Sequence, residues 1–398
     1  MSARISSAGV HNAAIAQILA QQSKLSKTQT QVASGKRIQS PADDPIAATR
    51  IIDMERTRAQ LQQYSRNSNA ATNRLQLAEQ SLADTGTLLQ RVRELALQAN
   101  NATLDASSRS SIAAEMRARV QELQDIANRR DAGGEYLFAG YSTRTQPFAR
   151  GVTGVGYAGD QGVRSLELAP DQRVPDGFSG QQVFMDVPQG NGTFTTAAGV
   201  HTGTGSIDPG QIVDATSWVR GSYTLRFTTT ATWEVVDATN AVVSTGSYTP
   251  GSAIGFNGAQ VTVTGAPAAG DTFVIAPAAR ESMFQTLDEL ITTLGSAADN
   301  PVGRSQLNTE ITAALAQIDQ GLSHAINLRA EVGARLSAVD SADQSREALD
   351  VELSSSLSGL QDLDYAEAIS RMNQQLTGLQ AAQAAYTRIA QLSLFDYL

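Results

Sequence analysis

Residues 54–99 carry small or apolar side chains at alternating spacings of three and four residues. This spacing places them on one face of a helix, and a seam of such length is typical of a coiled coil or a long helical bundle. The seam consists of Met54, Thr57, Leu61, Tyr64, Ser68, Ala71, Leu75, Ala78, Leu82, Thr85, Leu89, Val92, Ala96 and Ala99. We therefore expect one long helix that packs along most of its length against other helices.

Cap and turn residues predict where this helix begins and where an earlier one ends. Gly35 is a natural residue after a helix C-terminus, because glycine enters the left-handed region without strain. Asp44 can accept hydrogen bonds from first-turn amides, and Pro45 suits the first helical position, where no N–H is needed. The sequence thus predicts a helix up to Gly35, a connector, and the long helix from Pro45.

Both ends of the chain repeat the helical spacing. The N-terminal seam consists of Ala8, His11, Ile15, Ile18, Gln22, Leu25, Gln29 and Val32. After the predicted N-cap Asp364, the C-terminal seam consists of Ile369, Met372, Leu376, Leu379, Gln383, Tyr386 and Ala390, followed by apolar Leu394, Phe395 and Leu398. Such a helix cannot bury its apolar stripe alone, and two of them paired would be marginal. They can dock on the protein's own core or against other subunits.

The middle of the chain has a different composition. It holds 15 of the 21 aromatic residues, between Tyr136 and Phe273, and eight of the 11 prolines. Residues 223–228 alternate apolar and polar side chains as a half-buried strand does, and Asn257-Gly258 is a preferred hairpin dipeptide. We also predict a hairpin loop at residues 237–240 and strands at residues 135–140, 163–168 and 183–187. These features indicate a β-rich domain between helical arms.

No pattern in the sequence indicates an active site. A formal net charge of −9 argues against nucleic-acid binding, and no apolar run is long enough for membrane insertion. There is no cysteine, and the three histidines lie on different segments, which makes a metal site improbable. Asp208, Asp237 and Asp271 lie beside turn residues and are expected to shape turns. No P-loop, nucleophile elbow or zinc-binding motif occurs, so we expect neither an enzyme nor a cofactor.

A helical arm returns after the middle domain. Residues 281–294 are predicted to form a helix, and Asn300-Pro301 starts a longer one with the same cap and proline arrangement as Asp44-Pro45. Its seam consists of Leu307, Ile311, Leu315, Ile318, Leu322, Ala325, Val332, Leu336 and Val339, with Leu349, Leu353 and Leu357 further along. The layout is therefore a short helix, long helices, a β-rich insertion, a long helix and a terminal helix.

Three motifs in the arms resemble the flagellin superfamily. Residues 32–45 (VASGKRIQSPADDP) are similar to the link between the two N-terminal helical segments of flagellins. Residues 89–98 (LQRVRELALQ) resemble a motif of the long helix, and residues 362–369 (DLDYAEAI) resemble the start of the C-terminal axial helix. The motifs cover both arms, in the family's order.

The resemblance implies an α+β multidomain fold, in which long N- and C-terminal helices form coiled-coil or bundle arms around a β-rich middle domain. The expected parts are an axial helix (1–40), the first part of a helical bundle (41–145), a β-rich outer domain (146–278), the second part of the bundle (279–361) and a C-terminal axial helix (362–398). The expected assembly interface consists of Ile15, Ile18, Leu25, Val32, Ile369, Met372, Leu376, Leu379, Tyr386, Leu394, Phe395 and Leu398.

Some departures point to one branch of the superfamily. Pro45 stands where flagellins usually carry alanine, and residues 135–140 (EYLFAG) and 392–398 (LSLFDYL) look like the proteins of the hook–filament junction. This resemblance implies secretion by the flagellar type III export apparatus with an export chaperone. At the junction, the chain would self-associate in a ring and contact hook-associated protein 1 and flagellin. The alternatives are flagellin itself, or an extracellular adhesin or enzyme on a flagellin-like frame.

Overall fold

The computed structural model describes residues 7–101, 103–152 and 154–395, and divides the chain into two compact units. The first unit joins the residues up to Arg66 to those from Ala342 onward, and the second runs from Asn67 to Ser341. The long helices α2 (Pro45–Ala99) and α5 (Pro301–Gln361) contribute residues to both units. The predicted α+β class, with helical arms around a β-rich middle, is confirmed; the five-part division remains a prediction.

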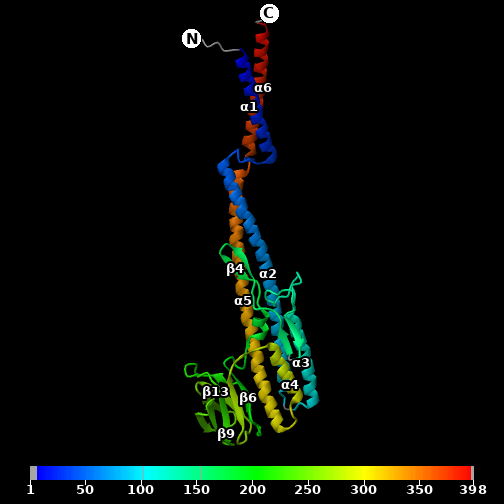
Figure 1. The fold of residues 1–398 in the computed structure, drawn as a ribbon, viewed down its shortest axis with the longest axis vertical. Helices are drawn as coiled ribbons and strands as arrows, with labels where there is room; N and C mark the ends of the chain where they lie inside the picture. Colours follow the sequence, from blue (N-terminus) through cyan, green and yellow to red (C-terminus); the bar gives the residue numbers. More distant parts are fainter. Residues whose placement is uncertain (1–6, 102, 153, 396–398) are drawn as a thin grey trace. The chain divides into compact units, whose positions relative to one another are not determined.

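The helices of the second unit form a bundle, in which α3 (Ala106–Ala127) packs beside α4 (Met283–Ser296) (Figure 1). The predicted seam of α2 is buried at every position from Leu61 to Ala99, whereas Thr57 is exposed. Arg93 on α2 pairs with Asp319 on α5 at 2.8 Å. The three- and four-residue spacing therefore identified the buried face of α2 correctly over most of its length.

Short hairpins connect the bundle to the rest of the second unit. Strand β1 (Phe148–Gly151) pairs with β2 (Gly154–Tyr157), and β3 (Ser165–Ala169) pairs with β4 (Gln172–Pro175). Side chains of this region meet the bundle in an aromatic cluster, where Phe148 lies 5.5 Å from Phe284 of α4 and 5.4 Å from Phe184 between ring centroids. These rings pack the β1–β2 hairpin against α4.

Two sheets form the outer part of the second unit (Figure 1). The five-stranded sheet has the order β11-β10-β9-β14-β6, and the other has the order β12-β13-β7, with β8 also paired to β13. The strands are β6 (Phe194–Ala198), β7 (Ser206–Ile207), β8 (Gln211–Ile212), β9 (Tyr223–Thr229), β10 (Thr232–Asp237), β11 (Val242–Ser247), β12 (Ala253–Phe256), β13 (Ala259–Thr264) and β14 (Thr272–Pro277). Asn257 and Gly258 both adopt positive φ between β12 and β13, which confirms the predicted hairpin.

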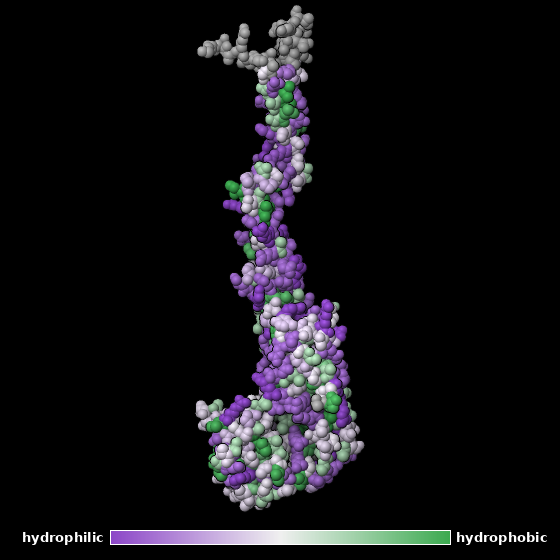
Figure 2. Space-filling view, in the orientation of Figure 1, coloured by the Kyte–Doolittle hydropathy of each residue, from purple (hydrophilic) through white to green (hydrophobic). Residues whose placement is uncertain are grey.

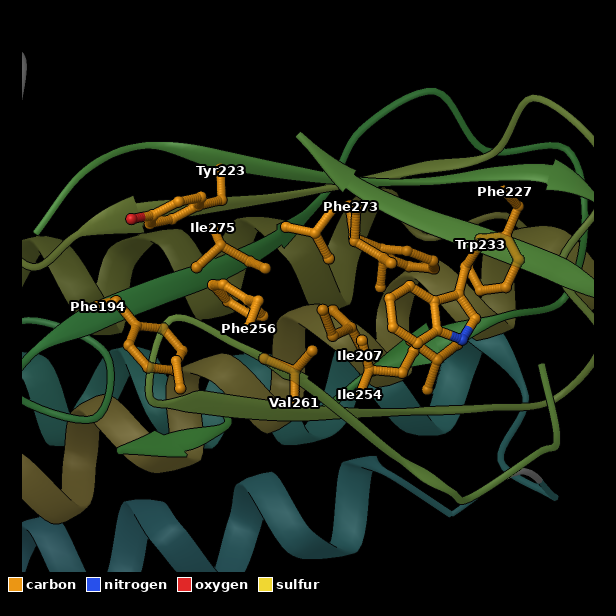
Figure 3. Close-up of a cluster of buried hydrophobic side chains, with 14 residues drawn as sticks. Phe194, Ile207, Tyr223, Phe227, Trp233, Ile254, Phe256, Val261, Phe273 and Ile275 are labelled. Carbon is orange, nitrogen blue, oxygen red and sulfur yellow. The ribbon is translucent and has the colours of Figure 1, made fainter. Parts of the chain in front are cut away.

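Aromatic and β-branched side chains from both sheets fill the space between them (Figure 3). The alternation predicted for residues 223–228 is observed, because Tyr223, Leu225 and Phe227 of β9 point into this core. Phe273 of β14 is fully buried, and its ring lies 6.1 Å from that of Phe227 in an edge-on arrangement. The indole of Trp233 donates to the carbonyl of Ser247, so its polar atom is satisfied at the margin of the core.

Two of the predicted strands are wrong. Residues 183–187 were expected to be a strand, but Gln181–Met185 forms a π-helix, and only Val187–Pro188 (β5) is extended. Residues 135–140 form turns with one isolated bridge between Tyr136 and Arg130. In both segments, apolar residues at adjacent positions are buried in the same aromatic cluster, which a strand with alternating faces cannot do.

The outer sheets join the rest of the second unit through a narrow stem. Strand β5 pairs with β15 (Arg280–Glu281), the amide of Gln189 donates to the carbonyl of Ala279 at 2.9 Å, and the amide of Ala278 donates to the carbonyl of Thr193 at 2.9 Å. The incoming and outgoing chains thus run antiparallel, side by side. Beyond the stem, Ser305 of α5 donates to the carbonyl of Gly205 at 2.5 Å.

The three turn aspartates act as predicted, and Asp271 is the most deeply buried of them. Its carboxylate accepts hydrogen bonds from the amides of Thr202 (2.7 Å), Ala268 (2.8 Å) and Gly203 (3.0 Å). Burial acts to raise the pKa of Asp271, but the amides of Ala268 and Thr202 favour the ionised form, so that the pKa is lowered overall. Asp208 and Asp237 likewise accept from turn amides.

We expect the outer sheets to lose stability in acid through Asp271. Because its pKa is lower in the folded state than in the unfolded chain, the ionised carboxylate contributes stability above about pH 4, and this contribution is lost as the pH falls through the lowered value. The measurement is the urea midpoint from tryptophan fluorescence, followed from neutral pH to below pH 4. In Asp271→Asn, the midpoint at neutral pH should be lower and its fall in acid smaller; an unchanged acid profile would contradict the assignment.

Candidate assembly site

The chain ends form an antiparallel helix pair in the first unit, made of α1 (Ser7–Ser34) and α6 (Tyr365–Phe395) (Figure 1). Near the start of α6, the amide of Leu363 donates to the carbonyl of Gly35 at 2.9 Å. At the far end, the hydroxyl of Tyr386 hydrogen-bonds Nε2 of His11, with the two ring centroids 4.7 Å apart. The pair therefore keeps one register along its length.

The structure buries only part of the predicted interface within this pair. Leu25 is buried, and Ile18, Val32, Met372, Leu379 and Tyr386 are half-buried. The exposed members are Ile15 (39%), Ile369 (43%) and Leu376 (38%). The side chains of Leu394 and Phe395, and all of Leu398, lie outside the described residues. Ala368 is fully buried where the predicted stripe has Ile369, so the seam of α6 is displaced by one residue at that turn.

The pair consequently keeps apolar side chains on its outer faces. Leu19 of α1 is 59% exposed and adds to Ile15, Ile369 and Leu376. Figure 2 shows hydrophobic residues on the surface of this helix pair, between hydrophilic ones. Burying such side chains against another subunit is favourable, by about 1.5–3 kcal/mol for a fully buried leucine or isoleucine. These faces are the candidate assembly surface of the chain.

The connector, residues 35–44, lies against the end of α5 and the start of α6. The amide of Arg37 donates to the carbonyl of Gln361 at 2.7 Å, and its guanidinium donates to the carbonyl of Leu360 at 2.8 Å. Lys36 and Asp362 form an isolated antiparallel bridge. Ile38 of the connector is buried together with Leu357 and with Ala47, Ala48 and Ile51 of α2. The sequence indicated a link at these residues but not its contacts with the other chain end.

Charged and capping groups fix the local conformation of the connector. Asp43 pairs with Lys27 of α1 at 2.5 Å and accepts from the amides of Gln39 and Ser40, and these bonds lower its pKa, the bond from Lys27 most. Asp44 accepts from the amide of Ala47 at 3.0 Å and so caps α2, as predicted. Asp364 caps α6 as predicted, since it accepts from the amides of Ala366 and Glu367.

The described residues contain no group of three or more histidine, cysteine, aspartate or glutamate side chains that could hold a metal ion. Within the same ranges, no helix combines the length and the apolarity that crossing a membrane requires. His11 contacts Tyr386, and His324 hydrogen-bonds the carbonyl of Gln182 at 2.8 Å.

Comparisons with known proteins agree with this architecture. Residues 5–143 match the bacterial flagellin N-terminal helical region, and residues 315–398 match the bacterial flagellin C-terminal helical region. Flagellar hook-associated protein 3 of Escherichia coli (strain K12) is 25% identical over 371 residues, which are 92% of this chain and 90% of that protein.

Two solved structures are also similar. The crystal structure of Xanthomonas campestris FlgL is 37% identical, with a TM-score of 0.69, and the likeness covers 75% of this chain and 99% of that one. The crystal structure of flagellar hook-associated protein 3 from Legionella pneumophila is 30% identical, with a TM-score of 0.75, and the likeness covers 78% of this chain and 98% of that one.

The helical arms and the inserted sheets thus define a protein of the flagellin superfamily. Within it, the chain belongs to the family of flagellar hook-associated protein 3. It is a structural component of the bacterial flagellum, exported to the hook–filament junction. Its relatives are parts of the flagellum and not enzymes.

Proposed function

We propose that this chain is a junction adaptor, whose terminal helices join hook-associated protein 1 on one side to the flagellin filament on the other. The observation that carries the proposal is the apolar outer surface of the α1–α6 pair, where Ile15, Leu19, Ile369 and Leu376 are exposed in the single chain. Exposed apolar side chains on a narrow helix pair are typical of surfaces that other helices cover in an assembly. Copies of the chain pack side by side through this surface in a ring.

The proposed interface keeps the residues expected from the sequence. Ile15, Ile369 and Leu376 offer side chains that a neighbour can cover, while Leu25 already stabilises the pair itself. The proposed interface also includes Leu394, Phe395 and Leu398, as expected from the sequence. The route to the junction is the flagellar type III export apparatus, with an export chaperone that binds the terminal segments before assembly.

Flagellin itself is the less supported alternative, because the likeness that extends over 92% of the chain is to a hook-associated protein 3. The two functions differ in self-assembly: flagellin forms long filaments, whereas a junction adaptor stops at a ring.

Electron microscopy of the purified chain tests the proposal. The protein alone should form no long filaments. After hook-associated protein 1 and flagellin are added, it should be found at the boundary between the two, which gold-labelled antibodies against the outer sheets can locate. A control reaction without this chain should give few joined ends. Long filaments of this chain alone would contradict the adaptor function and support flagellin.

A further inference from the structure

We propose that the connector, with residues 360–365, acts as a clasp that sets the register of α1 against α6. The term clasp is used here for residues 35–44 and 360–365 together. Gly35, Arg37 and Tyr365 are its positioning residues. In this inference the helix seam supplies contact area, and the clasp supplies the alignment. Only the consequence for assembly rests on the proposed adaptor function.

Apart from the contact between His11 and Tyr386 at its far end and the close approach of Gly378 to Gln21, the seam between α1 and α6 contains little that could fix a register. At the facing positions, Thr28 and Gln31 of α1 are buried, but they hydrogen-bond the carbonyls of Lys24 and Arg37 and not α6. On α6, Oε1 of Gln375 is buried and has no hydrogen-bond partner among the described residues. Large apolar side chains in matching holes normally define the alignment of paired helices. Here several of the large ones, Ile15, Ile369 and Leu376, are exposed.

The clasp, in contrast, makes contacts that allow a single alignment. The carbonyl of Gly35 accepts a hydrogen bond from the amide of Leu363, and the amide of Arg37 donates to the carbonyl of Gln361. Two main-chain hydrogen bonds therefore hold the connector to residues 361–363. The guanidinium of Arg37 adds a third bond, to the carbonyl of Leu360. Gln31, in the last turn of α1, donates to the carbonyl of Arg37 at 2.6 Å and ties the helix to the clasp.

The two chain ends approach each other closely at Gly35. Its φ of +71° lies in the left-handed region, and a Cβ atom placed there would be 2.8 Å from the hydroxyl oxygen of Tyr365, the first residue of α6. The next atom of that ring, Cζ, would be at an ordinary 3.8 Å. A side chain at residue 35 would therefore be strained in its own backbone conformation and would have to push the ring of Tyr365 away from the connector.

The clasp also connects two parts of the chain that are synthesised at different times. Arg37 and Leu360 are 323 residues apart in sequence. A chain that lacks its last segment can form α1 but not the clasp. The aligned assembly surface is consequently present only when both chain ends are available.

Pulsed electron paramagnetic resonance tests the alignment directly, because the chain has no cysteine of its own. Spin labels are attached in the full chain at Asn12→Cys and Thr387→Cys, both exposed, which leaves His11 and Tyr386 in place. The parent chain should give one narrow distance. Gly35→Ala should shift it or add a second distance, displaced by about 5 Å, one helical turn. Adding Tyr365→Phe to Gly35→Ala should largely restore the parent distance, since it removes the hydroxyl that lies closest to the new methyl group.

Gly359→Ala is the matched control, because it adds the same methyl group near the end of α5, where a Cβ meets nothing within 4 Å. It should leave the distance unchanged. A parent-like distance in Gly35→Ala, or no defined distance in the parent chain, would overturn the inference.

The same proteins separate this inference from the proposed function. Added to hook-associated protein 1 and flagellin, Gly35→Ala should give at least tenfold fewer joined ends than Gly359→Ala. If the parent chain itself joins nothing while the distances behave as described, the adaptor function fails and the clasp stands. If Gly35→Ala changes the distance but joins normally, the clasp sets the alignment of the free chain only, and its role in assembly is refuted.

Discussion

Replacing Leu376 by aspartate is expected to abolish incorporation of the chain at the junction and to leave the fold of the second unit intact. Leu376 is 38% exposed on α6 and belongs to the first unit, so part of its side chain is free for a neighbouring subunit and none of the packing of the second unit depends on it. In the assembly, the same position would lose about 1.5–3 kcal/mol of apolar burial and would place an unpaired carboxylate in an interface. Because every copy in a ring carries the change, the loss is repeated at each contact.

Gln374→Asp is the matched control for this prediction, since residue 374 is exposed on the same helix and receives the same charge without losing an apolar side chain. Joined ends are counted by electron microscopy for both variants. Thermal melting is followed by the fluorescence of Trp218 and Trp233, which both lie in the second unit. Normal incorporation of Leu376→Asp would show that this face of α6 is not an assembly surface.

Replacing Phe273 by alanine is expected to destabilise the outer sheets by about 3–5 kcal/mol, the usual cost of removing a buried aromatic ring. The ring is fully buried between the two sheets and lies edge-on to Phe227 and to His201, with the centroid of the latter 5.6 Å away. Urea unfolding monitored by tryptophan fluorescence measures the loss, because Trp233 belongs to the same core.

The neighbouring residue provides the control. Val274 is 40% exposed on the opposite face of the same strand, so Val274→Ala should change the unfolding free energy by no more than about 0.5 kcal/mol. Incorporation at the junction should be close to normal for both variants at a temperature where the sheets stay folded. Equal effects of the two substitutions on stability would contradict the arrangement of β14.

The sequence was most informative where one periodic signal runs over many residues. The seam of α2 was predictable because each buried position from Leu61 to Ala99 repeats the same helical spacing. Local chemistry was equally clear at Asp44 and Asp364, where a carboxylate caps a helix, and at Asn257-Gly258, where both residues need positive φ. In each of these cases, the determinant lies within a few residues of the structure that it produces.

Prediction failed where distant parts of the chain decide the conformation. The runs at residues 135–140 and 183–187 are rich in β-forming residues, but Phe138 and Phe184 pack against each other and against the bundle, and this tertiary burial overrides strand propensity. On α6, the larger Ile369 was assigned inward, whereas the pair buries the small Ala368. A small side chain lets two helices approach, and a pattern based on size alone does not detect this.

The connector shows the same limit for the candidate site. Its motif was recognised by resemblance, and its glycine and aspartates indicated a link between two helices. Its partners are Leu360, Gln361 and Leu363, which lie more than three hundred residues away in sequence. The sequence of the connector itself contains no pattern that indicates these contacts. The exposure of Ile15 and Leu376 likewise depends on how α1 and α6 face each other.

The stem formed by β5 and β15, which joins the outer sheets to the rest of the second unit, has a consequence for how the chain can vary. The chain enters the outer sheets at Gln189 and leaves them at Ala279, so the two ends of this insertion lie side by side at a hydrogen-bonded crossing. Other hydrogen bonds between the insertion and α5 involve Gly190, Gly205 and Ser206. Domains whose termini lie close together can be exchanged with little disturbance to their host. The stem is therefore a natural grafting point, at which the outer surface of the junction can diversify, shrink or carry foreign sequence while the helical frame keeps its geometry.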